Sequence, residues 1–323
     1  MSFRPSSLRI VGLLVTVLVP AGVACSSSSD APLGAYNPGA DSGGGGGGND
    51  SGGGGGGNDS GGGGGNDSGG GGGNDSGGGN DTGAPPACTG LAFCEDFETL
   101  DGKITNGMTI GAWKASVSGT ITTFAVDGVK PHSGSKALHI TVSGNMEAGA
   151  PARGTLNQTK AGGLVTGNNL FGRAMVFYSD QGGNGLPLAV HSWLFNSSGM
   201  GKSADASTGN VTMNMGGGGA KMQLNYHPVA PATEQSMQGG TMTTGVWHCV
   251  QWQYDGAGTP PANTAKVWVD GAVAVDVPAT KGWEFATPWT SMDFGFTHYQ
   301  TLAAGVDVYL DDFAVNDTMV ACP

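Results

Sequence analysis

The segment from Trp247 to Val277 constrains the fold of this chain more than any other. It reads WHCVQWQYDG and, after a short break, TAKVWVDGAVAVDV, which predicts strands at Gly245 to Tyr254, Thr264 to Val269 and Ala272 to Val277. The Asp-Gly pair at 270–271 is a strong hairpin signal, because both central residues of a type I′ turn need a positive φ. We therefore predict an antiparallel hairpin at the heart of the domain.

Side chains alternate along the second of these strands. Val267 and Val269 fall on one face, whereas Lys266, Trp268 and Asp270 fall on the other. A sheet with one apolar face must bury that face, and in antiparallel folds a second sheet provides the cover. The hairpin thus predicts two packed layers.

Eight further segments have strand character, and Gly, Asn, Asp and Pro separate them. No window shows a convincing apolar period of 3.6 residues, so no helix is expected. Many short strands without helices are typical of a β-sandwich or jelly roll. We predict an all-β domain of two antiparallel sheets. The eight segments are Thr120 to Val126, Ala137 to Val142, Leu170 to Tyr178, Ala189 to Phe195, Val211 to Met215, Lys221 to Tyr226, Asp293 to His298 and Val306 to Val315.

Composition divides the chain at Cys88. Of 323 residues 63 are Gly and only 12% are charged, so one globular domain cannot fill the whole length. Residues 88–323 have a normal length for one large jelly-roll domain. They hold 18 acids and 11 bases with no cluster of Lys or Arg. This balance excludes nucleic acid as a partner, and we expect a monomer.

The N-terminus predicts export. Arg4 and Arg9 precede an apolar run from Ile10 to Val19, which is too short to span a bilayer and is typical of a secretory signal peptide over residues 1–24. The sequence AGVAC that ends at Cys25 resembles a bacterial lipoprotein signal, whose peptidase cuts before a Cys that is then lipidated. We predict lipidation of Cys25 as the protein's membrane attachment. The alternative is ordinary secretion.

Residues 25–87 predict a disordered tether. From Asp30 onward, Asn-Asp-Ser and Asn-Asp-Thr triplets recur between runs of Gly, and no residue there can build a core. Calcium-binding nonapeptide repeats are also rich in Gly and Asp, but they need an apolar residue in each turn. A flexible coil of this length would span about 40 Å, enough to hold a domain clear of a membrane surface.

Four cysteines follow the tether, namely Cys88, Cys94, Cys249 and Cys322. An even number in an oxidising compartment predicts two disulfides, and the sequence leaves three connectivities open. Zinc is the weaker interpretation, because no pair of cysteines and no neighbouring His has zinc spacing. Cys249 lies in a predicted hairpin strand, so its bridge would tie the sandwich to a terminus.

Three separated segments look as if they meet in the fold: FCEDFE (Phe93 to Glu98), PHSGSKALHITV (Pro131 to Val142) and VYLDDFAV (Val308 to Val315). In this order they resemble the jelly rolls of carbohydrate-binding modules and of certain polysaccharide lyases, where such segments surround a structural calcium. The resemblance implies Glu98 and Asp312 as carboxylate ligands and Ser135 as a backbone or side-chain ligand. The alternative is that Asp311 and Asp312 end a strand in solvent.

The middle of the chain narrows the resemblance. The segments FGRAMVFY, AVHSWLF, GVWHCVQWQYDG, KVWVDG and FGFTHYQ look like those of bacterial relatives of fungal cellulose-induced proteins and glucuronan lyases. Such lyases cleave uronates by β-elimination, which needs a group on the carboxylate, a base for the C5 proton and an acid for the leaving oxygen. The resemblance implies Arg173, His191 and Tyr299 in these roles, with Gln300 or His298 assisting.

Several family positions differ. Alginate-lyase-like jelly rolls carry the patterns RxELR, Q-[IV]-H and YFKxGxYxQ. This chain has RGTLNQ, Ala189 two positions before His191, and Gly295 where the Lys of the third pattern falls. These departures leave two alternatives open. His191 can be a surface or core histidine, and Arg173 can be a partly buried structural residue.

Seven tryptophans are compatible with sugar stacking, because an aromatic face packs well against the C–H face of a pyranose ring. Trp268 is the best candidate, since it shares a face with Lys266 and Asp270, and Trp193 and Trp252 follow. The alternative for each is burial in the core. We predict carbohydrate recognition at the cell envelope, with two alternatives: an active lyase on a uronate polymer, and an adhesion or matrix module without sugar specificity.

Overall fold

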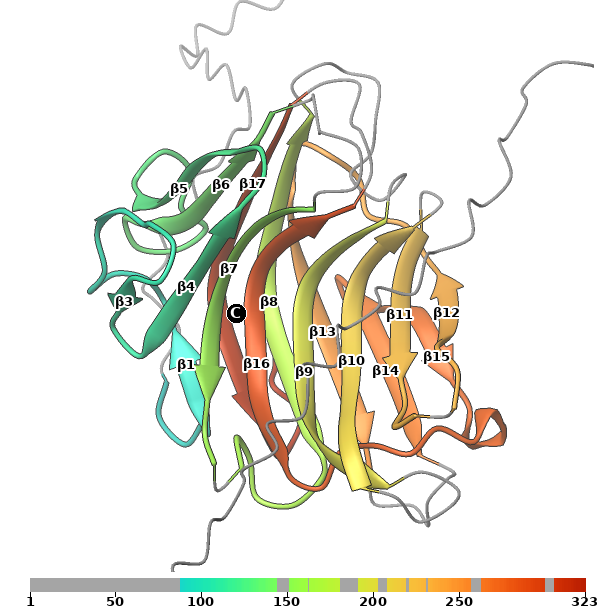
Figure 1. The fold of residues 1–323 in the computed structure, drawn as a ribbon. Coiled ribbons are helices and arrows are strands. Elements are labelled where there is room, and N and C mark those ends of the chain that lie inside the picture. Colours follow the sequence, from blue (N-terminus) through green and yellow to red (C-terminus); the bar gives the residue numbers. More distant parts are fainter. Residues whose placement is uncertain are drawn as a thin grey trace, which may run out of the picture. The chain divides into compact units, whose positions relative to one another are not determined.

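The computed structural model describes residues 88–143, 151–161, 163–180, 191–202, 208–218, 221–230, 232–256, 263–299 and 305–323. Within these ranges the chain is built from antiparallel strands in two sheets, as the sequence predicts (Figure 1). No helix of this described part is long and apolar enough to cross a membrane. The signal peptide, the tether, Cys25 and Gln300 lie outside the described residues.

The first sheet, sheet A, has the strand order β15-β14-β13-β8-β17-β6-β5-β2, and β1 pairs with β17. The central strands come from distant parts of the chain, since β8 lies between β13 and β17. Its strands are β1 (Phe93–Glu95), β2 (Gly102–Lys103), β5 (Ile121–Asp127), β6 (Ala137–Val142), β8 (Leu170–Asp180), β13 (Trp247–Asp255), β14 (Thr264–Val269), β15 (Ala272–Val277) and β17 (Val306–Asn316).

The second sheet, sheet B, has the order β12-β11-β10-β9-β16-β7-β4-β3. It faces the viewer in Figure 1, where its long curved strands lie in front of sheet A. Its strands are β3 (Thr109–Ile110), β4 (Trp113–Ser118), β7 (Ala152–Thr159), β9 (Ser192–Lys202), β10 (Thr208–Gly218), β11 (Lys221–His227), β12 (Gln235–Gly239) and β16 (Trp289–His298).

Aromatic side chains from both sheets fill the space between them. Trp252 of sheet A stacks on Phe195 of sheet B with ring centroids 4.4 Å apart, and Phe313 meets Phe294 at 4.3 Å. All four rings are almost completely buried. Full burial of one such side chain stabilises the fold by roughly 1.5–3 kcal/mol, so this layer contact accounts for the two-sheet architecture.

The hairpin that the sequence predicts is present. Asp270 has φ 50° and Gly271 has φ 78°, as a type I′ turn requires. Val267 and Val269 are buried, whereas Trp268 is partly exposed on the outward face of sheet A. The alternation and the turn were therefore both predicted correctly.

Every strand predicted from the sequence is present; β6, β14 and β15 have the predicted bounds, and the ends of the other eight are shifted. The prediction missed six strands: β1, β2, β3, β4, β7 and β12. β7 reads ARGTLNQT, in which a Gly and several polar residues conceal the strand pattern, although Ala152, Gly154 and Leu156 are buried in turn. Contacts with its neighbours β4 and β16 hold this strand, so local propensity was a poor guide.

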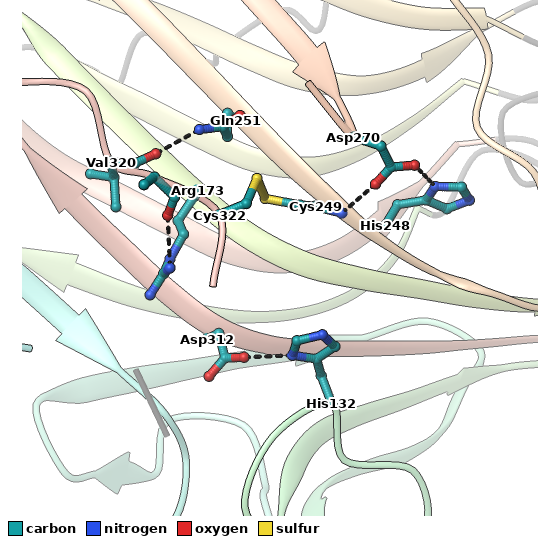
Figure 2. The surroundings of a disulfide bond; sticks show 10 residues. His132, Arg173, His248, Cys249, Gln251, Asp270, Asp312, Val320 and Cys322 are labelled. Carbon is teal, nitrogen blue, oxygen red and sulfur yellow. Dashed lines mark hydrogen bonds and ion pairs between the residues drawn. A yellow bond between two sulfur atoms is a disulfide. The ribbon is translucent and has the colours of Figure 1, made fainter. Parts of the chain in front are cut away.

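Two disulfides are present, as predicted. Cys88 pairs with Cys94, and Cys249 on β13 pairs with Cys322 near the C-terminus. Figure 2 shows the second bridge beside two hydrogen bonds that hold the same C-terminal segment: Arg173 Nη1 donates to the Ala321 carbonyl at 2.8 Å, and Gln251 Nε2 donates to that of Val320 at 2.7 Å. The C-terminal segment is thus fastened to the outward face of sheet A.

Candidate functional site

The outward face of sheet B carries polar side chains in register across its strands. Strand alternation explains this, since Met213 and Met215 of β10 point into the core and Asn214 points to the opposite face, where its neighbours cover it. Two rows of directly paired residues cross the sheet. The amide row is Lys114, Asn157, Asp293, Asn196, Asn214, Asn225 and Ser236, and the arginine row is Ser118, Arg153, Thr297, Trp193, Gly216, Gln223 and Gln238.

Two of the predicted catalytic residues meet beside the arginine row. The His191 and Tyr299 rings have centroids 5.3 Å apart, and Trp193 lies 4.9 Å from Tyr299 and 6.1 Å from His191. The Tyr299 backbone N–H also donates to the His191 carbonyl at 3.1 Å. Gly216 pairs with Trp193 and a side chain there would collide with the Ser192 carbonyl, so glycine is required at this point.

The hydrogen bonds of His191 indicate which of its ring nitrogens carries the proton. The Trp193 indole Nε1 and the Asn225 amide Nδ2 each lie 3.2 Å from His191 Nε2. An indole N–H can only donate, and an amide nitrogen likewise donates, so Nε2 must carry the lone pair. His191 is therefore neutral in this arrangement, with its proton on Nδ1. A neutral imidazole with an accepting Nε2 has the form of a general base.

Arg153 joins this group from β7. Burial raises the pKa of the Tyr299 hydroxyl above its usual value, whereas the charge of Arg153 and a hydrogen bond from its side chain act in the opposite direction, and the charge of Glu234 raises it again. Tyr299 is thus a protonated phenol at neutral pH, in contact with a guanidinium. A phenol in this state can donate a proton.

Glu234 closes the other side of the group. Asn225 uses its second amide hydrogen to bind Glu234 Oε1 at 2.9 Å, and Glu234 Oε2 lies 3.6 Å from His227 Nδ1. Asn214 Nδ2 lies 2.7 Å from His227 Nε2. These contacts orient Asn225 toward His191, so Glu234 helps to position Asn225 against the His191 ring.

A pocket opens on the same face. Asp293 is at its wall, and its carboxylate accepts hydrogen bonds from Asn157 Nδ2 at 2.8 Å and Asn196 Nδ2 at 3.3 Å. Burial raises the pKa of Asp293, and the Asn157 hydrogen bond and the Arg153 charge partly offset this effect. The lining residues are Arg153, Thr155, Trp193, Leu194, Phe195, Asn196, Asp293 and Thr297.

Arg173 does not lie with His191 and Tyr299. It is on β8 in sheet A, only 4% exposed, and hydrogen-bonded to the C-terminal segment (Figure 2). Burial lowers its pKa and the nearby Asp312 carboxylate raises it. The structure thus corrects the expected constellation: Arg173 has the place of a structural residue, and Arg153 is the cation beside Tyr299. His298, the predicted assistant, is fully buried.

The three tryptophans predicted to bind sugar are separated. Trp252 is 1% exposed in the core, so its prediction as a sugar-stacking residue is not supported. Trp268 is partly exposed, but on the outward face of sheet A. Trp193 lies on the outward face of sheet B, in the pocket wall. Of the three, Trp193 alone shares a surface with His191 and Tyr299.

The predicted calcium ligands each have partners within the protein. Glu98 accepts from the Ser135 N–H and hydroxyl and from the Lys136 N–H, at 2.7–2.8 Å. Asp312 contacts His132 Nδ1 at 2.7 Å and the Ser133 hydroxyl at 2.8 Å. Glu98 and Asp312 thus hold opposite ends of one loop.

This donor set fits a hydrogen-bonded loop better than a calcium shell. The described residues contain no group of three His, Cys, Asp or Glu side chains placed to hold a metal ion. Asp311 and Asp312 are 0% exposed, so the alternative in which they end a strand in solvent is wrong. Burial and the charge of Asp312 raise the pKa of Asp311 to about 8. Calcium at Glu98, Ser135 and Asp312 stays a prediction.

Sequence reasoning missed Arg153, Asn225, Glu234 and Asp293. The signal for Asn225 was available, because KMQLNYH alternates apolar and polar residues and places Gln223, Asn225 and His227 on one outward face. Arg153 alternates with Ala152 and Gly154 in the same way, but β7 was not predicted. Glu234 lies outside any strand, and no local pattern marks it.

Comparison with known proteins identifies no family. The chain matches no model of a known protein family, and no curated protein is similar to it in sequence. Among solved structures, endo-β-1,4-glucuronan lyase from the fungus Trichoderma reesei aligns with a TM-score of 0.46 and 13% identity, over 71% of this chain and 96% of that chain.

Two other solved structures align more weakly. The binding domain of botulinum neurotoxin serotype C1 has a TM-score of 0.40 and 12% identity over 69% of this chain, which spans about half (49%) of that chain. The alginate lyase from Klebsiella pneumoniae has a TM-score of 0.37 and 9% identity over 56% of this chain and 81% of that chain. At these values no function is transferred from them.

Proposed function

We propose that the outward face of sheet B binds a uronate-containing polysaccharide, with Arg153, His191, Trp193 and Tyr299 at the centre of the site. The observation that carries this proposal is that these four partly exposed side chains meet on the polar outward face of sheet B. A guanidinium beside a phenol can bind a carboxylate through charge-assisted hydrogen bonds. Trp193 offers an aromatic wall for a pyranose ring, and the partly exposed Asn157 and Asn196 of the amide row offer hydrogen-bonding groups for hydroxyls.

The same group favours β-elimination as a second candidate function. Arg153 would bind the uronate carboxylate and stabilise the negative charge that develops when C5 is deprotonated. His191 Nε2 would give up the hydrogen bonds that it accepts from Trp193 and Asn225 and take the C5 proton. The electron pair of the C5–H bond would form the C4–C5 double bond. The C4–oxygen bond would break, and the leaving oxygen would take the Tyr299 proton. The neutral state of His191 and the protonated state of Tyr299 support these roles.

One experiment tests binding and cleavage together. The full chain is titrated calorimetrically with uronate-containing and neutral polysaccharides, and ultraviolet absorbance of the unsaturated product is followed in parallel. Binding that Arg153→Met weakens, with product formation, supports a lyase. Binding without product supports a recognition module. The proposal fails if no acidic polysaccharide binds, and an adhesion module without sugar specificity would then be favoured.

The proposal includes a place of action. The two disulfides fit an oxidising compartment, as in exported proteins. We propose that a lipid on Cys25 and the tether over residues 25–87 hold the domain at the cell surface. Mass spectrometry of the mature protein tests this, since an acylated Cys25 at its N-terminus is the expected result and a free or paired Cys25 would contradict it.

A further inference from the structure

The pocket beside Arg153 has a chemical character of its own. Arg153 and Asp293 both line this pocket, and the charge of Arg153 acts on Asp293, so a sugar chain with a carboxylate on Arg153 has Asp293 close by. The type of sugar unit that can bind beside Asp293 therefore decides which unit can follow the uronate in the bound chain. This step rests on the proposed function of the face.

The groups around Asp293 leave acceptors in the pocket wall. Asn157 and Asn196 both turn their amide nitrogens to the Asp293 carboxylate. Asn196 Oδ1 is consequently left over, and within the described part of the chain this buried oxygen has no hydrogen-bond partner. A carboxylate has about four lone-pair sites, of which the two amides use two. The wall thus favours a ligand that donates hydrogen bonds.

A uronate carboxylate is the wrong ligand for this wall, because it only accepts hydrogen bonds and carries the same charge as Asp293. A neutral sugar is the right one, because its hydroxyls donate. Trp193 forms the adjacent wall, and its ring can pack on the C–H face of an uncharged pyranose.

We propose that this site selects a mixed polysaccharide in which a uronate is followed by a neutral sugar, with the carboxylate on Arg153 and the hydroxyls of the neutral unit on Asp293 and Asn196. A homopolymer of uronates would bring a second carboxylate against Asp293. Asp293 is then a specificity-determining residue. Removing the charge of Asp293 should therefore reduce the preference for the mixed polysaccharide over the uronate homopolymer.

The test compares three oligosaccharides of equal length by calorimetry on the full chain: one alternating uronate and neutral hexose, one of uronates alone, and one neutral. The alternating ligand should bind at least about tenfold tighter than the uronate homopolymer. Asp293→Asn should reduce this ratio to below about threefold, mainly through a gain on the homopolymer. Asp276→Asn, the same change on edge strand β15 of sheet A, should leave the ratio unchanged.

A second variant keeps the test valid if Asp293→Asn does not fold, which circular dichroism would reveal. Asn196→Ala removes the unpaired acceptor Asn196 Oδ1 without a change of charge. It should therefore lower the affinity for the alternating ligand and leave the affinity for the uronate homopolymer no higher. An equal or tighter fit of the homopolymer to the unmodified protein would overturn the selection while leaving the proposed function intact. Failure of both acidic ligands would overturn the proposed function itself.

Discussion

The Tyr299 N–H donates to the His191 carbonyl at 3.1 Å, and their side-chain rings lie 5.3 Å apart. Tyr299 follows the last residue of β16 and His191 precedes the first residue of β9, so the pairing of these two antiparallel strands brings the residues together. The two groups are therefore held by sheet geometry rather than by a long loop. A general base and a general acid need this kind of fixed separation.

The first prediction concerns this pair. His191→Ala and Tyr299→Phe should each lower the rate of product formation on a cleaved uronate polymer by about 10²–10⁴, because each removes one proton-transfer group. Affinity should change by less than about threefold, since neither group carries the main charge contact. Initial rates from product absorbance and affinities from calorimetry check this. Full activity in both variants would exclude the assigned roles.

The second prediction separates the two arginines. Arg153→Met should weaken binding of an acidic polysaccharide by about tenfold or more, because a charge-assisted hydrogen bond is lost. Arg173→Met should leave affinity unchanged and lower the free energy of unfolding by about 3 kcal/mol, because it leaves the buried Asp312 without its neighbouring cation. Calorimetry and urea unfolding of both variants decide it. A loss of affinity in Arg173→Met, with no loss in Arg153→Met, would instead indicate that Arg173 binds the polysaccharide.

The third prediction compares the tryptophans. Trp193→Ala should weaken carbohydrate binding by about tenfold, since its ring forms the pocket wall. Trp252→Ala should lower the free energy of unfolding by about 3–5 kcal/mol, because this ring stacks on Phe195 in the core. Trp268→Ala, on the other sheet, serves as the control for binding and should leave affinity unchanged. Loss of carbohydrate binding in Trp268→Ala would indicate that the binding site lies on sheet A.

The sequence predicted the architecture because alternation and turns are local signals. Val267, Val269 and the Asp270-Gly271 turn specify a two-faced hairpin without reference to the rest of the chain. β7 was missed because a Gly and several polar residues make its alternation weak, and its pairing with β16 and β4 decides its conformation.

The site was predicted only in part, for a topological reason. Arg153 and Arg173 both sit on strands with alternating neighbours, and nothing local states that β7 joins sheet B and β8 joins sheet A. His191 and Tyr299 were found because family resemblance marks them. Asn225 and Glu234 act on His191 from another strand and a loop, so their roles appear only once the chain is folded.

The fourth prediction concerns calcium. Because Glu98 and Asp312 already accept hydrogen bonds from the loop that ends at Lys136, we expect the melting temperature to be the same with calcium and with a chelator. Glu98→Gln should lower the melting temperature equally in both conditions, since it weakens the loop anchor. A rise of the melting temperature on calcium addition that Glu98→Gln and Asp312→Asn abolish would instead establish the predicted calcium site.

The fifth prediction ranks the two disulfides. Cys249 and Cys322 are 73 positions apart, and Cys88 and Cys94 are 6 apart. In the chain-entropy account a longer closed loop restricts the unfolded state more. Loss of the Cys249–Cys322 disulfide should therefore lower the free energy of unfolding by about 4 kcal/mol, and loss of the Cys88–Cys94 disulfide by about 2 kcal/mol.

The long bridge also holds the C-terminal segment where Arg173 and Gln251 bind its carbonyls. Removal of the Cys249–Cys322 disulfide should therefore loosen that segment over sheet A, whereas removal of the Cys88–Cys94 disulfide should not. Urea unfolding of the Cys249→Ser/Cys322→Ser and Cys88→Ser/Cys94→Ser proteins measures the costs, and amide hydrogen exchange at residues 318–322 measures the loosening. Equal costs with unchanged exchange would contradict this assignment. Carbohydrate binding should survive in both proteins, because neither bridge touches the outward face of sheet B.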